Sequence, residues 1–126
     1  NNQKLLFQQH LNSIIERVSI KSQCKISYTG SISRPPKPLD NKQLKLFNFI
    51  KDCANQLNLA LDWKYVGGVC DGNNLAATGL PVVDTLGVRG GLIHTDQEFV
   101  LLDSLVERAQ LSTVILYNLA KQGGLK

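Results

Sequence analysis

Three prolines within four residues divide this chain more firmly than any other feature of its sequence. The run SRPPKPLD occupies residues 33–40 and contains Pro35, Pro36 and Pro38. Proline lacks a backbone N–H and restricts the residue before it, so this run can neither continue a strand nor form a helix interior. The run therefore predicts a stiff, extended connector and a domain boundary between residues 1–33 and residues 34–126.

The residues before the connector predict one helix and one strand. Over residues 4–18 the apolar side chains recur at i, i+4, i+7, i+8 and i+11, which is one face of an amphipathic helix. Over residues 24–33 apolar and polar residues alternate, as in a half-buried antiparallel strand. His10 lies off the apolar face, and we expect it to be solvated. One helix and one strand cannot enclose a core, so this part is expected to need partner strands.

After the connector the pattern alternates between helix and strand. Asp40, with Gln43 three residues later, predicts a capped helix start, and residues 60–66 alternate as a strand does. A glycine turn, a short helix over residues 73–78 ended by Gly79, and an apolar strand over residues 81–86 follow. Ser104 and Glu107 predict a second capping box, and the helix behind it is apolar enough to be largely covered. The order predicts an α/β layer.

Composition excludes several classes of function. With 126 residues, 43% apolar and 19% charged, the chain has the balance of an ordinary soluble domain. Its net charge of +4 is spread over scattered lysines, which argues against a nucleic-acid partner. No apolar run is as long as a membrane span, and no signal peptide is present, so we expect a cytoplasmic protein without a membrane partner. The chain starts at Asn1 inside a helical pattern, so it is expected to be a piece of a longer protein.

The candidate functional residues lie mainly between Gly67 and Glu98. His94, in a glycine-rich loop, is a candidate metal ligand or general base. Cys70 could act as a nucleophile with His94 as its base, although this would also need an oxyanion hole and an orienting acid.

The three cysteines form no CxxC pair, which favours free thiols in a reducing compartment. The sequence GGVCDGNN at 67–74 predicts either an anion-binding loop or simply a tight turn between strand and helix. Arg34 is either a stiffly mounted carboxylate binder or a surface arginine of the connector.

Three motifs together resemble the C-terminal part of the two-zinc aminoacylase family. The chain has GGVCDGNNLAATGLPVVDTLG at 67–87, GGLIHTDQEFV at 90–100 and LDSLVERAQL at 102–111. Members of that family show a GG-x-[ST]-D turn, a G-[IKL]-P-V strand and a G-x-x-H-[ST]-x-x-E loop before the last helix. They include bacterial glutamate carboxypeptidase, acetylornithine deacetylase and succinyl-diaminopimelate desuccinylase. The order and spacing agree over residues 67–121, more loosely back to residues 33–36, and resemble the glutamate carboxypeptidase-like branch best.

The resemblance implies a fold for each part. Residues 34–126 would be the C-terminal part of a phosphorylase/hydrolase-like zinc peptidase catalytic domain of the α/β class. Residues 1–33 would be the last helix and last strand of an inserted ferredoxin-like α+β lid domain, through which such enzymes form homodimers. This would explain why residues 1–33 alone cannot enclose a core.

The resemblance also implies roles for individual residues. His94 matches the family's C-terminal zinc ligand, and Glu98 matches a frequent acid behind that ligand. Arg34 matches the arginine that binds the free carboxylate of the substrate. The substrate-binding turn corresponds to Gly68, Cys70 and Asp71, and Cys70 replaces the usual serine or threonine by a weaker hydrogen-bonding thiol.

The function implied is hydrolysis of an amide bond next to a carboxylate, in a small peptide or an N-acyl amino acid, by a metallopeptidase with two zinc ions. In such a site zinc polarises the carbonyl group and activates a water molecule. The other ligands and the general base of the family lie upstream of this chain. The isolated chain is therefore expected to be inactive, to lack a catalytic residue of its own and to hold no zinc. The alternative is a non-catalytic binding or dimerisation module of the same fold.

Overall fold

The computed structural model describes residues 2–125, and the chain divides between Arg34 and Pro35 into two compact units. The division lies within the proline-rich run, where the backbone has no regular secondary structure. Each unit has its own internal contacts, so each is described by itself. The assignment of the two units to a lid domain and a catalytic domain stays a prediction.

The first unit consists of helix α1, Asn2–Ser22, and an extended segment behind it. The phenol O–H of Tyr28 donates to Asn12 Oδ1 at 2.7 Å, and Gln8 Nε2 donates to the same phenol oxygen. Lys4 Nζ lies 3.5 Å from the carbonyl oxygen of Ile32. These bonds hold the extended segment against the helix it follows.

The predicted strand over residues 24–33 is wrong for the structure. Within the described residues this segment pairs with no other strand, because only α1 lies beside it. Its apolar side chains are correspondingly open to solvent, with Ile26 39% and Tyr28 44% exposed. The helix was predicted correctly, but its apolar face is uncovered as well: Phe7 is 56% and Ile14 48% exposed.

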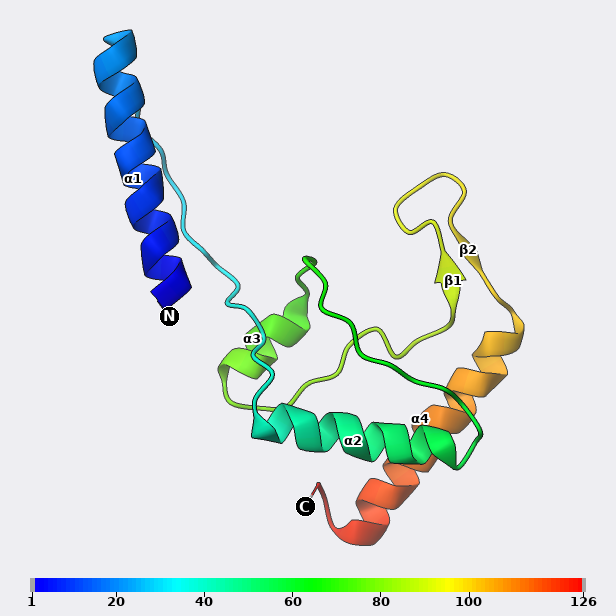
Figure 1. Ribbon diagram of the computed structural model, residues 1–126. Helices are drawn as coiled ribbons and strands as arrows, with labels where there is room; N and C mark the ends of the chain where they lie inside the picture. Colours follow the sequence, from blue (N-terminus) through cyan, green and yellow to red (C-terminus); the bar gives the residue numbers. More distant parts are fainter. Residues whose placement is uncertain (1, 126) are drawn as a thin grey trace. The chain divides into compact units, whose positions relative to one another are not determined.

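The second unit is rich in helix and contains one small sheet (Figure 1). Its helices are α2 at Asn41–Asn55, α3 at Asp71–Ala77 and α4 at Asp103–Gln122. Strands β1, Gly90–Gly91, and β2, Phe99–Val100, pair antiparallel, with Gly90 opposite Val100 and Gly91 opposite Phe99. The mixture of helix and sheet agrees with the predicted α/β class at a coarse level only.

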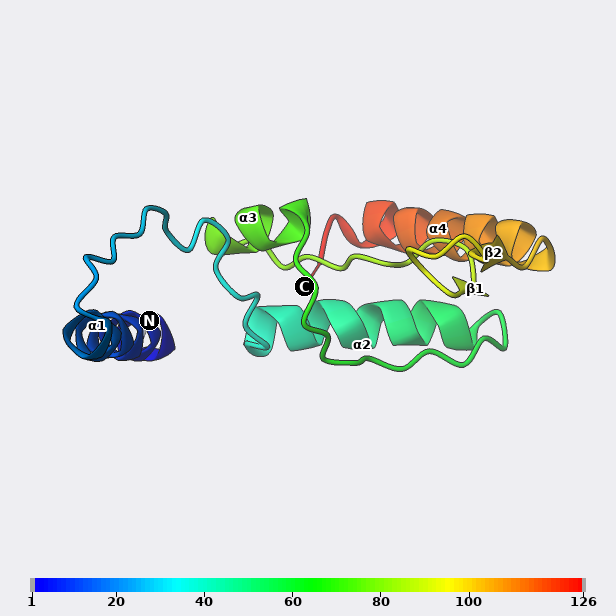
Figure 2. The same ribbon diagram turned by 90° about the horizontal axis from the view of Figure 1, so that it is seen from above.

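The core of the second unit lies between α2 and α4. Figure 1 shows the two helices crossing, and Figure 2 shows them as two adjacent layers. Cys53, Ala54 and Leu111 are fully buried where they meet. The half-buried apolar residues packed around them come from both helices and from the extended segments, and are Phe49, Leu57, Leu59, Leu61, Leu86, Val114 and Ile115. This small cluster holds α2, α4 and the extended segments of the second unit together.

The predicted strands over residues 60–66 and 81–86 are extended but form no ladder among the described residues. A strand is stabilised by a hydrogen-bonded neighbour, and neither segment pairs with a strand in the described chain. Both segments instead pack on the helices: Trp63 stacks on Phe47 with ring centroids 3.9 Å apart, and Leu86 contacts the core. The alternation over residues 60–66 and the apolar run over residues 81–86 thus identified extended segments correctly but not their pairing.

Helix ends follow the predictions in part. Asp40 caps α2, since its Oδ1 accepts from the Gln43 backbone N–H at 2.8 Å, and Gly79, with φ +88°, follows the end of α3 as predicted. The return bond of the first capping box is absent, because the Gln43 side chain bonds to Val82 instead. The second capping box is also wrong: Leu102 precedes α4, and Ser104 and Glu107 face the segment before β1.

The expectation that α4 is largely covered is wrong. Leu111 is buried, and Val114 and Ile115 are half-buried against α2. The opposite face is open, with Val106 63% and Leu116 67% exposed. In the part of the chain that the structure describes, no element lies over this face.

Candidate functional site

His94 lies in the loop of a short hairpin formed by β1 and β2 (Figure 1). The loop spans residues 92–98, and His94 is exposed. The His94 backbone is in the left-handed region with φ +68°, which is uncommon for a residue with a side chain. A hydrogen bond holds this conformation: the His94 N–H donates to Glu98 Oε2 at 3.1 Å. Glu98 therefore fixes the backbone from which the imidazole projects.

The glycine pair of β1 is required by the close approach of Phe99. A Cβ at Gly91 would lie 2.9 Å from ring carbons of Phe99, and one at Gly90 would overlap the Phe99 carbonyl oxygen. Only glycine lets the two strands come this close. The other glycine pair differs, since a Cβ at Gly67 or Gly68 would meet no atom within 4 Å. Glycine is therefore required in the His94 hairpin and not at Gly67 or Gly68.

The hairpin is fastened to the first turn of α4. The Arg89 N–H donates to Ser104 Oγ at 2.9 Å, and the Leu101 N–H donates to the Arg89 carbonyl at 2.8 Å. Arg89 Nη2 also pairs with Glu107 Oε2 at 3.0 Å. Ser104 is completely buried, so this attachment is a fixed part of the unit. It sets where the His94 loop stands relative to α4.

A second polar cluster surrounds Asp84, in the extended segment before the hairpin. Asp84 Oδ2 accepts from Lys37 Nζ at 2.6 Å and from Cys70 Sγ at 3.1 Å. The side chains of Lys37 and Asp84 are 20% and 35% exposed, so the pair is largely shielded from solvent. One carboxylate oxygen thus joins the proline-rich connector to the GGVCDG turn.

Two further contacts support the same junction. Asn73 Nδ2 donates to the Pro35 carbonyl at 2.9 Å, while Asn73 Oδ1 accepts from the Cys70 N–H at 3.1 Å. The amide of Gln43 makes both a donor and an acceptor bond to the backbone of Val82, at 2.8 and 2.9 Å. Gln43 and Asn73 are buried with these partners. We call the set Lys37, Gln43, Cys70, Asn73 and Asp84 the Asp84 junction.

The junction changes the acidity of its central carboxyl group. The hydrogen bond from Lys37, and then that from Cys70, lowers the pKa of Asp84 below its ordinary value of 3.8. Partial burial opposes this but is the weaker effect. Asp84 is therefore ionised near neutral pH, as its acceptor role requires.

The predicted site residues fall into separate groups. His94 and Glu98 meet in the hairpin loop, whereas Cys70 belongs to the Asp84 junction. Gly68 and Asp71 are exposed on either side of Cys70. Arg34 is the last residue of the first unit and is exposed there.

The geometry does not favour the cysteine-hydrolase alternative. The Cys70 thiol donates to a carboxylate, and none of the hydrogen bonds among residues 2–125 joins it to His94. A nucleophilic thiol would need a base within hydrogen-bond reach to accept its proton. Its actual partner, Asp84, has a lowered pKa and is a poor proton acceptor.

Sequence reasoning missed Lys37 and Asp84. A signal for Asp84 was present, because an acid that ends the apolar run PVV must find a partner once that run is packed. Lys37 gave no comparable signal, since a lysine between prolines is equally compatible with a solvated connector. Gln43 was noticed, but as a capping residue.

The residues present do not fit a complete metal centre by themselves. Within residues 2–125 no group of three or more His, Cys, Asp or Glu side chains is arranged to hold a metal ion. A structural or catalytic zinc ion needs at least three protein ligands. The hairpin offers one exposed imidazole, on a backbone that Glu98 holds, and this fits a single ligand of such a centre.

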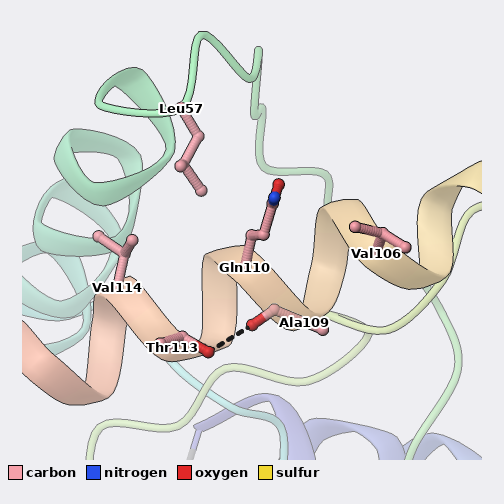
Figure 3. A pocket seen from close by; sticks show the side chains of 6 residues that line it. All are labelled: Leu57, Val106, Ala109, Gln110, Thr113 and Val114. Atoms are coloured by element: carbon pink, nitrogen blue, oxygen red, sulfur yellow. Dashed lines mark hydrogen bonds between the residues drawn. The ribbon is translucent and has the colours of Figure 1, made fainter.

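An open hollow of about 410 Å³ lies elsewhere, over α4 and the end of α2 (Figure 3). Leu57, Val106 and Val114 line it with Ala109, Gln110 and Thr113. The Thr113 hydroxyl is turned back to the Ala109 carbonyl at 2.9 Å, so it does not offer its proton to the hollow. None of the predicted site residues lies here, and the apolar lining presents no catalytic group.

Comparison of the chain with protein-family models, with curated proteins and with solved structures gives no match. Among the described residues no helix combines the length and the apolar character that crossing a membrane requires.

Proposed function

We propose that this chain forms the C-terminal part of a zinc-dependent hydrolase that cleaves an amide bond beside a free carboxylate. The observation that carries the proposal is the His94 hairpin. Its exposed imidazole stands on a backbone fixed by Glu98, by the close packing of Phe99 and by the attachment to α4. An exposed imidazole on a backbone held in this way can serve as one ligand of a metal ion.

In this proposal the chain contributes positioning and binding rather than a complete centre. His94 supplies one ligand, and Glu98 holds the loop in place. Gly68, Cys70 and Asp71 form the substrate-facing turn, and Arg34 binds the carboxylate of a small peptide or N-acyl amino acid. The remaining ligands of a two-zinc site and the general base would come from an upstream part of a longer polypeptide, cytoplasmic and dimeric through its lid.

The proposal is tested on the longer polypeptide that contains this chain. With zinc added, it is expected to hydrolyse N-acyl amino acids or dipeptides and to lose activity with a chelator. The His94→Ala variant should lose more than about 100-fold in kcat. This loss is larger than the loss of activity expected when a residue that only hydrogen-bonds to a metal ligand is replaced. His10→Ala, which changes an exposed histidine of α1, is the matched control and should retain activity. Equal activity of the two variants would refute the role of His94.

The 126-residue chain alone is expected to be inactive in the same assay. Turnover by this chain with zinc, above that of its His94→Ala variant, would contradict the proposal that the remaining ligands lie elsewhere.

A second candidate is a binding or dimerisation module without catalysis, and the exposed apolar face of α4 favours it. Val106 and Leu116 are each more than 60% exposed. Large exposed apolar patches commonly mark interaction surfaces. Absence of hydrolysis by the longer polypeptide, with normal zinc content and folding, would favour this candidate.

A further inference from the structure

The Asp84 junction brings together three segments of the second unit that are distant in sequence. The connector contributes Lys37, the GGVCDG turn contributes Cys70, and the extended segment before the hairpin contributes Asp84. Both donors converge on a single atom, Asp84 Oδ2, at 2.6 and 3.1 Å. Bonds to an ionised acceptor are stronger and more directional than neutral ones. The carboxylate therefore fixes the turn relative to the connector.

The turn itself is built to let this contact form. A Cβ on Gly72 would lie 3.0 Å from Asp84 Oδ2, 3.1 Å from Cys70 Sγ and 3.2 Å from Val82 Cγ1. All three distances are shorter than ordinary van der Waals contacts, so the thiol, the carboxylate and Val82 would have to shift by a few tenths of an ångström to admit a side chain at residue 72. Glycine at this position keeps both groups in reach of each other.

The thiol proton of Cys70 is thereby committed to Asp84. A cysteine offers one weak donor, and this donor is used within the protein. A bound substrate would meet the backbone and the neighbouring residues of the turn rather than the thiol proton. Where members of the resembled family have a serine or threonine hydroxyl, this chain has the Cys70 thiol. The difference then affects the hydrogen bond that holds the turn and not a contact with substrate.

We propose that Cys70 and Asp84 are positioning residues, which set the GGVCDG turn against the connector and so shape the carboxylate-side pocket of the proposed hydrolase. The pocket part of this inference rests on the proposed function. The junction part does not, and the experiment separates the two. Lys37 completes the Asp84 junction, because its ammonium group keeps Asp84 ionised and in place.

The junction is tested on the 126-residue chain by the alkylation rate of Cys70. In a Cys24→Ser background the exposed thiol is removed, and Cys53 is only 1% exposed, which leaves Cys70 as the accessible thiol. Asp84→Ala should raise the rate of reaction with iodoacetamide roughly 10-fold, the factor expected when a hydrogen bond to a charged group is lost. Asp84→Asn, which retains the side-chain size and one acceptor oxygen, should raise it less.

The matched control is Asp62→Ala. Asp62 also pairs with a lysine of the same unit, Lys51, at 3.5 Å, but its side chain is 86% exposed and bonds to no thiol. This variant should leave the alkylation rate unchanged. If Asp84→Ala unfolds the chain, as judged by circular dichroism, Asp84→Asn decides alone. An unchanged rate in every folded Asp84 variant would overturn the junction.

The pocket part is tested by kinetics of the longer polypeptide. Cys70→Ala should raise KM roughly 10-fold with little change in kcat, because it loosens the turn without touching the reacting atoms. Cys70→Ser, whose hydroxyl can donate to Asp84, should restore KM. A fall in kcat instead, or no rescue by serine, would refute the positioning role. If the alkylation results hold but no hydrolysis is found, the junction stands and the proposed function fails.

Discussion

At the scale of single residues, Asp84 shows how a charged group becomes part of a half-buried structure. Burial alone would favour its neutral form. Two donors reverse this preference, because Lys37 and Cys70 both bond to the ionised form. Their combined effect lowers the pKa of Asp84, so proton binding and folding are linked at this position.

This linkage predicts that the folded chain loses stability in acid. Because the pKa of Asp84 is lower in the folded than in the unfolded chain, folding gains stability above the unfolded value, near 3.8. This gain is lost as the pH falls through the lower, folded value. The side chain is 35% exposed, so the contribution is no more than about 1 kcal/mol after solvent screening.

Urea unfolding of the chain and of Asp84→Asn between pH 7 and pH 2.5 checks this prediction. The wild-type chain should be the more stable at pH 7, and the difference should shrink below pH 4. A difference that stays constant with pH would show that the carboxylate charge is not involved.

At the scale of elements, the glycine pairs at 67–68 and 90–91 have different reasons to be glycine. In β1 the Phe99 backbone and ring occupy the space that a Cβ would need. At Gly67 and Gly68 that space is open, and neither residue has a positive φ. Sequence alone could not distinguish them, since the contact with Phe99 arises from strand pairing between residues that are not neighbours in sequence.

Substitution of one glycine in each pair tests this difference. Gly90→Ala should destabilise the chain by about 1–3 kcal/mol, because the hairpin must open to admit the methyl group. It should also speed amide hydrogen exchange at residues 92–98. Gly67→Ala is the control and should stay within about 0.5 kcal/mol of the wild-type chain. Equal effects of the two changes would contradict the close packing at β1.

The elements also show what the sequence can and cannot predict. The helices were predicted because their apolar spacing and their caps are local: Asp40 and Gly79 act within a few residues of themselves. The strands at 24–33 and 60–66 were predicted from alternation and the strand at 81–86 from its apolar run, and both patterns imply a partner that the sequence does not identify. Gln43 and Ser104 looked like local caps, but their partners, Val82 and Arg89, are distant in sequence.

The candidate site divides along the same line. His94 and Glu98 are four residues apart, so their association could be anticipated from spacing. The Asp84 junction joins residues 37, 70 and 84. Only the fold of the second unit brings them together.

At the scale of the whole molecule, few apolar side chains are buried and many large ones are exposed. The buried apolar residues of the described chain are Ile50, Cys53, Ala54 and Leu111. Against this small set, α1 exposes Ile20 at 73% and α4 exposes Leu116 at 67%. Exposed apolar side chains of this size favour association.

We therefore predict that the isolated chain self-associates as its concentration rises. Light scattering should give an average mass above that of one chain at high concentration and a lower mass on dilution. The double variant Val106→Lys with Leu116→Lys places two charges on the exposed face of α4 and should reduce the association, because burying either lysine would cost free energy. Ser112→Lys with Gln122→Lys adds the same charge at exposed polar positions of the same helix and is the matched control. If both doubles reduce association equally, net charge and not the apolar face is responsible. A wild-type chain that stays monomeric at every concentration would refute the prediction and would mean that these faces need no cover in water.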